Sequence, residues 1–391
     1  MPTMLSADVD LPGQESSTEN RTFRRRPLSE AMVLEAAQLM SRAFAGNRRA
    51  MLDLEEALST SDFRAAAFEV LDREMMDRYQ DITPAWTMYA RRTTVRDFKE
   101  KKLVDLMGGQ AALEKVPELT EFPARSLSKA LYKIFVEKFG GRFQISWESM
   151  VNDELGELQD LPGHLAIGAR DTETKAAVGL LTDGDGPNAA YFNATAWGRT
   201  YDKDTDTWSG GSTNLLSGNP ALSETALTAA ITAIGQRKDP EGRPIVVADG
   251  YVLVIPPALE VTANEILNAV EIEITNGSRK TRVANWLRGK IKIVVEPWLT
   301  VLDTGANVNT TWYLLPAPTA SRPPFFVAFL RGREAPDLRV KADTGSRVGG
   351  GAIPAEDGSF DVDDIQYRVR HVVGTAGADM IATAASNGSG S

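Results

Sequence analysis

The 391-residue chain contains no cysteine and only two histidines, His164 and His371. Disulfide bonds, thiolate chemistry and cysteine-ligated zinc are therefore excluded, and a metal site or a catalytic relay built on imidazole groups is disfavoured. The two histidines lie far apart in the sequence, and we interpret each as a structural or surface residue. We expect no metal and no cofactor.

Long apolar runs and a secretory leader are also missing. The longest apolar stretch, around residues 251–259, is interrupted by Pro256 and Pro257, and it is far shorter than the ~20 residues that a membrane-spanning helix needs. Residues 1–20 lack a basic stretch followed by an apolar core, which is the pattern of a secretory signal. The sequence therefore predicts a protein made inside the cell and without membrane contact.

Positive charge is in deficit. The chain has 43 Lys and Arg residues against 53 Asp and Glu residues, a formal net charge of −10. This balance argues against a dedicated nucleic-acid binder, which neutralises many phosphates with basic side chains. It does not exclude a local basic face, and residues 91–102 carry six basic residues against two acidic ones.

Periodicity predicts helices first and a mixture of elements afterwards. Apolar spacing favours three helices within residues 27–79, and the prolines and glycines of residues 80–123 favour an extended arm with a short helix and no compact core. Residues 131–139 and 143–147 resemble two strands of a hairpin separated by Gly140 and Gly141. A long helix is expected over about 152–182, kinked at Pro162 and Gly163.

The second half of the chain has the clearest signals. Ser223 is placed to cap a helix, and Pro257 opens another helix that runs to Val270. Between and after them, apolar runs predict strands at 245–247, 251–255, 291–295, 311–315, 325–330 and 365–373, followed by a flexible glycine- and serine-rich tail. Strands and helices alternate without a regular βαβ repeat, so the predicted fold class is α+β.

One catalytic hypothesis survives a motif search. The tripeptide Asp-Thr-Gly occurs twice, at Asp303 and Asp343, and it resembles the signature of aspartic proteases, in which two close carboxylates share one proton. The two copies are only 40 residues apart, which is too few to build two symmetric lobes around them. Asp-Thr-Gly is also an ordinary turn sequence, in which Asp bonds the local backbone and Gly takes a positive φ. We therefore expect no catalytic residues.

Eight segments, in order, resemble the major capsid proteins of tailed phages, in particular the Mu-like prophage major head subunit family. Together they extend from about residue 80 to the C terminus. The segments are VRDFKEKKL (95–103), LEKVPELTE (113–121), FGGRFQISWESMVNDEL (139–155), STNLLSGNPALSETAL (212–227), VLVIPPALEVTANEIL (252–267), TWYLLPAP (311–318), FLRGREAPDL (329–338) and YRVRHVVG (367–374).

The resemblance implies a Hong Kong 97-like major capsid fold. Its parts would be an N-terminal helical extension (1–75), an N-arm (76–105), an extended β-hairpin loop (106–148), a peripheral domain with the spine helix (149–222), an axial domain (223–300), and the remaining axial strands with the return to the peripheral domain (301–391).

The same resemblance implies a non-enzymatic function. The chain would assemble with itself into pentamers and hexamers of an icosahedral shell around the double-stranded DNA of a tailed phage or prophage. Portal, scaffold or decoration proteins would be further partners, DNA contact would be non-specific, and the location would be the virion after synthesis in the cytoplasm of the bacterial host. The alternatives are an aspartic-type protease that uses Asp303 and Asp343, and a cellular nanocompartment shell of the same fold.

Overall fold

The computed structural model divides the chain into two units, Met1–Val70 and Leu71–Ser391. In the first unit the described residues are helical, as predicted, and helix α3 (Ser61–Asp81) extends into the second unit. The residues that the structure describes are 34–35, 37–39, 42, 49–50, 61–107, 128–146, 155–192, 200–202, 207–209, 213–238, 244–276, 279–320, 322–341 and 364–390.

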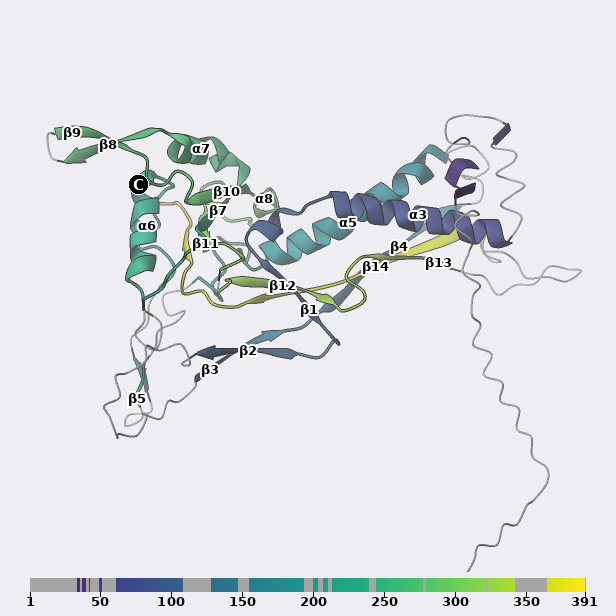
Figure 1. The fold of residues 1–391 in the computed structure, drawn as a ribbon, viewed down its shortest axis with the longest axis horizontal. Coiled ribbons are helices and arrows are strands. Elements are labelled where there is room, and N and C mark those ends of the chain that lie inside the picture. Colours follow the sequence, from purple (N-terminus) through teal and green to yellow (C-terminus); the bar gives the residue numbers. More distant parts are fainter. Residues whose placement is uncertain are drawn as a thin grey trace, which may run out of the picture. The chain divides into compact units, whose positions relative to one another are not determined.

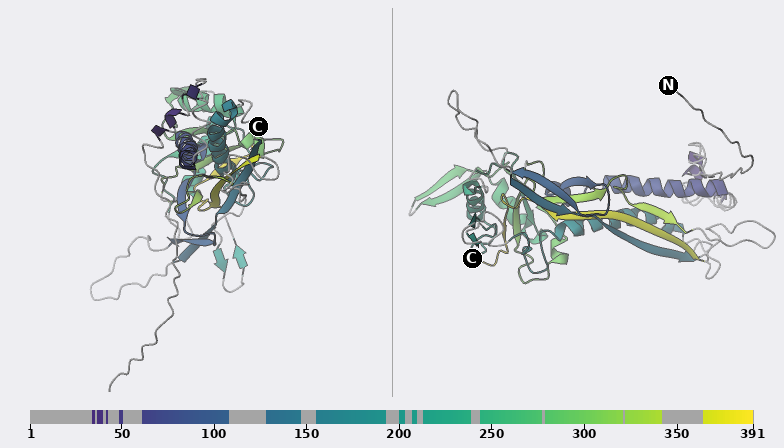
Figure 2. Two further views of the ribbon diagram at one scale, coloured as in Figure 1. Left: turned by 90° about the vertical axis from the view of Figure 1, so that its right-hand side faces the viewer. Right: turned by 90° about the horizontal axis from the view of Figure 1, so that it is seen from below.

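A five-stranded sheet forms one layer of the second unit. Its strands are β1 (Arg91–Val95), β4 (Glu137–Ser146), β12 (Phe325–Leu330), β13 (Asp337–Val340) and β14 (Asp364–Gly377). Strand β1 pairs with β12 in parallel, whereas β14 pairs antiparallel with β12, β13 and β4. The long β4–β14 pair is prominent in Figure 2. The sheet therefore joins segments from both ends of the second unit.

The predicted long helix is confirmed as α5 (Leu155–Val178), which continues through Pro162 without ending. Its C-terminal residues Ala177 and Val178 are fully buried in the main core, together with Phe329 and Val373 of the five-stranded sheet. Figure 1 shows α5 running alongside this sheet. Packing of the helix against the sheet thus fixes the position of α5.

A second sheet has four strands in the order β10 (Ile291–Val295), β7 (Tyr251–Ile255), β11 (Trp312–Pro316) and β15 (Ala384–Ser386). Alternate residues of its central strands face different cores. Val252 and Val254 belong to the main core, while Leu253 and Ile255 pack in a second core. Burial on both faces explains why these strands are continuous apolar runs, without polar alternation.

Helices α6 (Glu224–Gln236) and α7 (Glu260–Asn268) cover the face of the four-stranded sheet that lines the second core. The predicted cap of α6 is confirmed, because the Ser223 hydroxyl accepts the amide of Ala226 at 3.1 Å. The remaining described elements are η1 (Ala85–Met88), β2 (Lys101–Met107), β3 (Ser128–Ile134), β5 (Thr200–Asp202), β6 (Thr207–Ser209), η2 (Pro257–Leu259), β8 (Glu271–Asn276), β9 (Arg279–Ala284) and α8 (Leu299–Leu302).

The predicted hairpin within residues 131–147 is wrong. Strand β3 pairs with β2, and β4 pairs with β14, so β3 and β4 belong to different sheets. Gly140 and Gly141 lie inside β4 instead of forming a turn. A Cβ atom at Gly140 would lie 2.6 Å from the carbonyl oxygen of Val369, so this glycine permits close approach of two strands.

Three further expectations need correction. Part of the predicted arm at 80–123 is core, because Trp86, Tyr89 and Val95 are buried. Residues 245–247 form no strand. The helix expected to reach Val270 ends at Asn268, and Val270 is exposed.

The tail is ordered up to Gly390 within the described residues. Ser386 ends β15, and Gly390 forms a bridge with Pro220. Its composition suggested flexibility, but its small residues allow close backbone packing. A Cβ at Gly388 would meet the carbonyl oxygen of Thr310 at 2.2 Å.

Candidate functional site

Asp303, the first residue of the proposed catalytic pair, is a buried turn residue that follows α8. Its Oδ1 atom accepts the amide of Gly305 at 2.8 Å, and its Oδ2 atom accepts the amide of Gly186 at 3.2 Å. The expected bond from Asp to the local backbone is confirmed. The expected positive φ of Gly305 is wrong; a Cβ there would lie 2.5 Å from Oδ1 of Asp185. Asp343 lies outside the described residues.

The two histidines differ in their surroundings. His164 is exposed on α5, as expected of a surface residue. His371 is buried on β14, and its Nε2 atom lies 3.0 Å from Oε1 of Glu173 on α5. The ring of His371 also contacts Tyr79 edge-on, with centroids 6.0 Å apart. The structural role expected for a histidine is therefore supported at His371.

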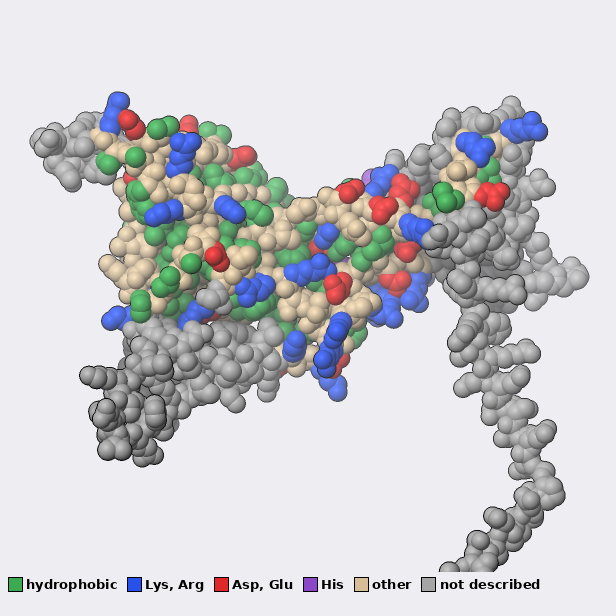
Figure 3. All heavy atoms as spheres, viewed as in Figure 1, with side chains coloured by type: hydrophobic (Ala, Val, Ile, Leu, Met, Phe, Trp, Pro, Cys, Tyr) green, Lys and Arg blue, Asp and Glu red, His purple; other side chains and the backbone are tan. Residues whose placement is uncertain are grey.

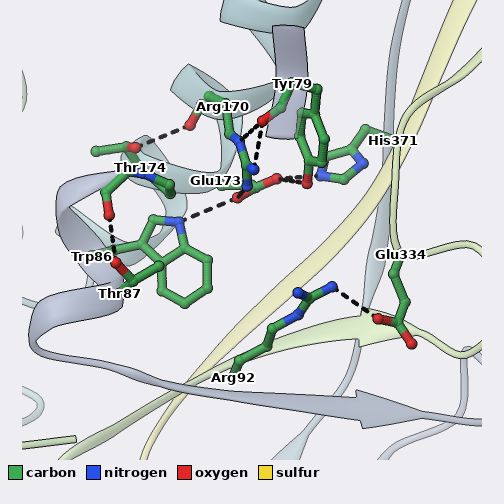
Figure 4. A network of polar contacts seen from close by, with 10 residues as sticks. Tyr79, Trp86, Thr87, Arg92, Arg170, Glu173, Thr174, Glu334 and His371 are labelled. Atoms are coloured by element: carbon green, nitrogen blue, oxygen red, sulfur yellow. Dashed lines mark hydrogen bonds and ion pairs between the residues drawn. The ribbon is translucent and has the colours of Figure 1, made fainter. Parts of the chain in front are cut away.

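Glu173 is the centre of a buried polar network (Figure 4). The hydroxyl of Tyr79 donates to Oε1, which also lies beside His371. The indole of Trp86 donates to Oε2 at 3.2 Å, and Arg170 donates to the same oxygen at 3.1 Å. These groups come from α3, η1, α5 and β14. One carboxylate on α5 thus joins the adjacent elements α3 and η1 to the distant strand β14.

Arg170 strengthens the link between α5 and the end of α3. Its Nε and Nη2 atoms donate to the carbonyl oxygen of Tyr79 at 2.9 and 2.6 Å. The guanidinium also lies 3.6 Å from the centroid of the Tyr79 ring, a distance suited to a cation–π contact. Arg170 therefore holds both the backbone and the side chain of Tyr79.

The electrostatics of the network favour an ionised Glu173. Burial by itself raises the pKa of this carboxyl, but hydrogen bonds from His371 and Tyr79 and the charge of Arg170 outweigh burial and lower it. Burial, followed by the neighbouring Glu173 charge, raises the pKa of Tyr79. The tyrosine thus stays a neutral donor to a charged acceptor, which is a strong type of hydrogen bond.

The Glu173–His371 pair has the composition of a catalytic acid–base pair, but a substrate has no access to it. A hollow of about 560 Å³ lies beside it, lined by residues that include Trp86, Arg91 and Arg170. Neither Glu173 nor His371 lines this hollow, and both side chains are almost completely buried. A substrate in the hollow would not reach the pair, so the arrangement supports a structural role.

Glu296, which follows β10, is a second buried carboxyl with fewer partners. Its Oε1 atom accepts the amide of Trp298 at 3.4 Å. The Tyr89 hydroxyl is close enough to affect the pKa of Glu296, although neither this hydroxyl nor Oε2 of Glu296 completes a hydrogen bond of good geometry. Burial raises the pKa of Glu296 to about 7, against the smaller opposing effects of Trp298 and Tyr89.

Part of the basic segment at 91–102 is engaged within the chain. Arg91 donates to the carbonyl oxygen of Pro318 at 2.9 Å, and Arg92 forms a 2.8 Å ion pair with Glu334. The ammonium group of Lys101 donates to the carbonyl oxygen of Thr94 at 3.3 Å. These arginines therefore attach β1 to neighbouring loops, a role that the composition alone did not indicate.

Sequence reasoning missed the Glu173 network entirely. Its members come from distant parts of the chain: Glu173 is 94 residues from Tyr79 and 198 residues from His371. No short motif joins them, and a single Glu within a long helix is an ordinary surface residue by pattern. A buried acid without a partner nearby in the sequence would have indicated such a network. The burial of Glu173, however, is known only once the fold is known.

Two features are absent from the described ranges. No helix there is long and apolar enough to cross a membrane. No group of three or more potential metal-ligating His, Asp or Glu side chains gathers there either.

Comparison with known proteins gives a clear family match. The model of the phage capsid protein family matches residues 131–384, well over half of the chain. No curated protein sequence matches.

The solved structures that match this chain share little sequence with it. Mycobacterium phage Patience is 12% identical, with 83% of this chain and 89% of that chain covered and a TM-score of 0.43. The capsid of a native GTA particle is 12% identical, with 78% and 90% covered and a TM-score of 0.44. A holo-encapsulin complex from Synechococcus elongatus PCC 7942 is 9% identical, with 79% and 89% covered and a TM-score of 0.42. On the family match, this chain belongs to the phage capsid protein family and is a structural subunit of a capsid shell.

Proposed function

We propose that the chain forms the pentamers and hexamers of an icosahedral shell with a Hong Kong 97-like fold, and that this shell encloses the double-stranded DNA of a tailed phage or prophage. The family match over residues 131–384 is the observation that carries the proposal. Closed shells of one subunit need contacts between different patches that close into rings. Many modest contacts per subunit then add up to a stable particle.

The parts of the fold are assigned within this proposal. We place the N-arm at 76–105 and the spine helix, α5, in a peripheral domain at 149–222. Residues 223–300, with α6, α7, β7 and β10, form most of the axial domain. Residues 301–391 supply the remaining axial strands, β11 and β15, and return to the peripheral domain. The N-terminal extension, 1–75, precedes these parts.

We place the extended loop at 106–148. The part that would extend over a neighbouring subunit is the connection between β2 and β3. These strands pair along their whole length, from Lys101 opposite Ile134 to Met107 opposite Ser128. Within the described part of the chain the ladder has two strands only. A two-stranded ladder has little stability of its own in water. A neighbouring subunit would stabilise such a ladder, and for this reason we assign the segment an intersubunit role.

Electron microscopy of the expressed chain tests the proposal. We expect rings, shells or tubes of repeated subunits, with a scaffold protein supplied where the chain alone does not assemble. Particles from the natural source should contain double-stranded DNA; protein cargo would instead support the nanocompartment alternative. Portal and decoration proteins should copurify with such particles. A chain that stays a single compact subunit under all these conditions would contradict the proposal.

A matched variant tests the extended loop. Residues 108–127 would be replaced by Asn-Gly, a dipeptide that closes a two-residue hairpin and so preserves the β2–β3 ladder. We expect a folded subunit, shown by an unchanged circular dichroism spectrum, that fails to form particles. Normal particles from this variant would refute the assignment of the loop.

A further inference from the structure

Three arginines lie side by side across three strands of the five-stranded sheet. Arg368 of β14 is directly paired with Arg339 of β13 on one side and with Arg142 of β4 on the other. Directly paired residues of antiparallel strands project from the same face, and neighbouring strands are about 4.8 Å apart. We call Arg142, Arg339 and Arg368 the arginine row.

The arginine row faces away from α5. Tyr367 and His371 have the opposite parity on β14, and His371 reaches Glu173 of α5. Phe143, opposite Tyr367, stacks on its ring with centroids 5.1 Å apart. The row therefore occupies the other face of the sheet, where all three arginines are exposed.

Only the far end of this face is covered by the described chain. There, Val372 and Ala376 pack against Ile134 and Val136. At the end that carries the arginine row, Arg370 adds further positive charge, while Lys138 lies opposite Val372 at the border of the covered end. Figure 3 shows basic side chains gathered where β13 and β14 lie. This half of the face is a charged surface, not a packed core.

The row is incompletely neutralised within the described residues. Asp337 pairs with both Arg339, at 2.9 Å, and Arg370, at 2.5 Å. Arg142 reaches only the amide oxygen of Gln366, at 3.5 Å, and no acidic group of the described chain pairs with Arg368. Like charges placed directly opposite each other destabilise a sheet. An external anion would relieve this repulsion.

The sequence supplies a complementary anion at the same end of the sheet. Residues 342–363 connect β13 to β14 and contain five acidic residues against one basic residue. Copies that meet at this end could each offer their acidic segment to the arginine row of the next copy. Such contacts between different patches close into a ring around a symmetry axis. Guanidinium and carboxylate groups are well matched for paired hydrogen bonds.

We propose that the arginine row is an intersubunit docking surface that binds the acidic segment 342–363 of a second copy of this chain. The inference rests on the proposed shell function and names one of its contacts. The carboxylates come from the neighbour, and the contact sets the register between copies at the tips of β4, β13 and β14.

Charge reversal tests the contact. The variant Arg142→Glu/Arg368→Glu should need a subunit concentration at least about tenfold higher for half-maximal assembly, because repulsion replaces attraction at a desolvated contact. Arg142→Lys/Arg368→Lys should assemble nearly normally. Arg331→Glu/Arg333→Glu, the same charge change at two exposed residues of the β12–β13 connection, is the matched control. We call the Arg142→Glu/Arg368→Glu variant the row-reversed chain. Its assembly at the wild-type subunit concentration would overturn the proposal.

Reversing the charges on both sides of the contact distinguishes a contact between copies from a contact within one copy. Adding Asp361→Arg and Asp363→Arg to the row-reversed chain should restore assembly. A mixture with tagged wild-type chains should then sort into separate particles, since the reversed row repels the wild-type segment. Mixed particles at the statistical ratio would show that the segment binds its own row and would overturn the intersubunit contact.

A binding measurement keeps the test independent of particle formation. A fluorescent peptide of residues 342–363 should bind the unassembled wild-type chain, and binding should fall about tenfold or more with the row-reversed chain. If the wild type never forms particles, the shell function fails while peptide binding still decides the docking surface. A short DNA duplex that binds the row more tightly than the peptide would assign the row to phosphate and refute the proposal.

Discussion

Glu173 and Glu296 are both buried carboxyl groups, but their surroundings affect their charge in opposite ways. Glu173 receives hydrogen bonds or close contacts from four side chains, and its pKa is lowered. Glu296 accepts one long hydrogen bond from the Trp298 amide, and its pKa is raised to about 7. Burial is therefore not enough to predict the charge of an acid; the number of donors aimed at it decides the direction.

The difference coincides with a difference in position. Glu173 joins α5 to α3, η1 and β14 through polar contacts. Glu296 lies where β10 leads into α8, next to Tyr89 and an otherwise apolar core. Polar contacts hold the elements together around Glu173. Around Glu296 apolar packing holds them together and tolerates one poorly paired acid.

The largest expected effect is the loss of the Glu173 carboxylate. Glu173→Ala should lower the free energy of unfolding of the unassembled chain by about 3–5 kcal/mol, because it strands Arg170 and several buried donors. Glu173→Gln keeps the acceptor and should cost less. Urea unfolding monitored by tryptophan fluorescence measures both. Equal stability of Glu173→Ala and the wild type would refute the central role of this carboxylate.

Glu296→Gln should act in the opposite direction at high pH. The folded-state pKa of Glu296 is raised, so its contribution to stability is complete below about pH 4.5 and is lost as the pH rises through about 7. At pH 8 the neutral amide should stabilise the chain by roughly 2–3 kcal/mol relative to the wild type. At pH 4.5 the two chains should unfold at similar urea concentrations.

The pH dependence of the two sites gives a control within one molecule. The pKa of Glu173 is lowered, so its stabilisation is present above the ordinary pKa of a carboxyl and is lost only as the pH falls further. Glu173→Gln should therefore remove a loss of stability on the acid side, while Glu296→Gln removes one between about pH 4.5 and 7. Identical pH profiles for the two variants would contradict the comparison.

The sequence was a good guide where one local pattern decides the structure. The Ser223 cap, the β7 and β11 runs and the long helix α5 follow from capping, continuous apolar character and helical spacing. The family resemblance was confirmed by the match over residues 131–384. Each of these signals is complete within about 30 residues or is repeated along the chain.

Prediction from the sequence failed where a residue's structural role depends on a partner far away along the chain. Gly140 looked like a turn residue because the strand that crowds it, β14, comes more than 200 residues later. The arginine row is similarly invisible, since Arg142, Arg339 and Arg368 become neighbours only through strand register. Glu173 gave no signal for the same reason. Pairing across the sheet, not local composition, creates these sites.

The smallest expected effect compares the two tyrosines beside these acids. Tyr79→Phe removes a donor from a charged carboxylate and should cost about 1.5–2 kcal/mol. Tyr89→Phe removes a buried hydroxyl that completes no hydrogen bond of good geometry, so it should change stability by less than about 0.5 kcal/mol. Urea unfolding at pH 7 measures both variants, which lose the same atom from equally aromatic side chains. A cost at Tyr89 equal to that at Tyr79 would mean that the Tyr89 hydroxyl does donate to Glu296, and the number of donors would then not explain the contrast between the two acids.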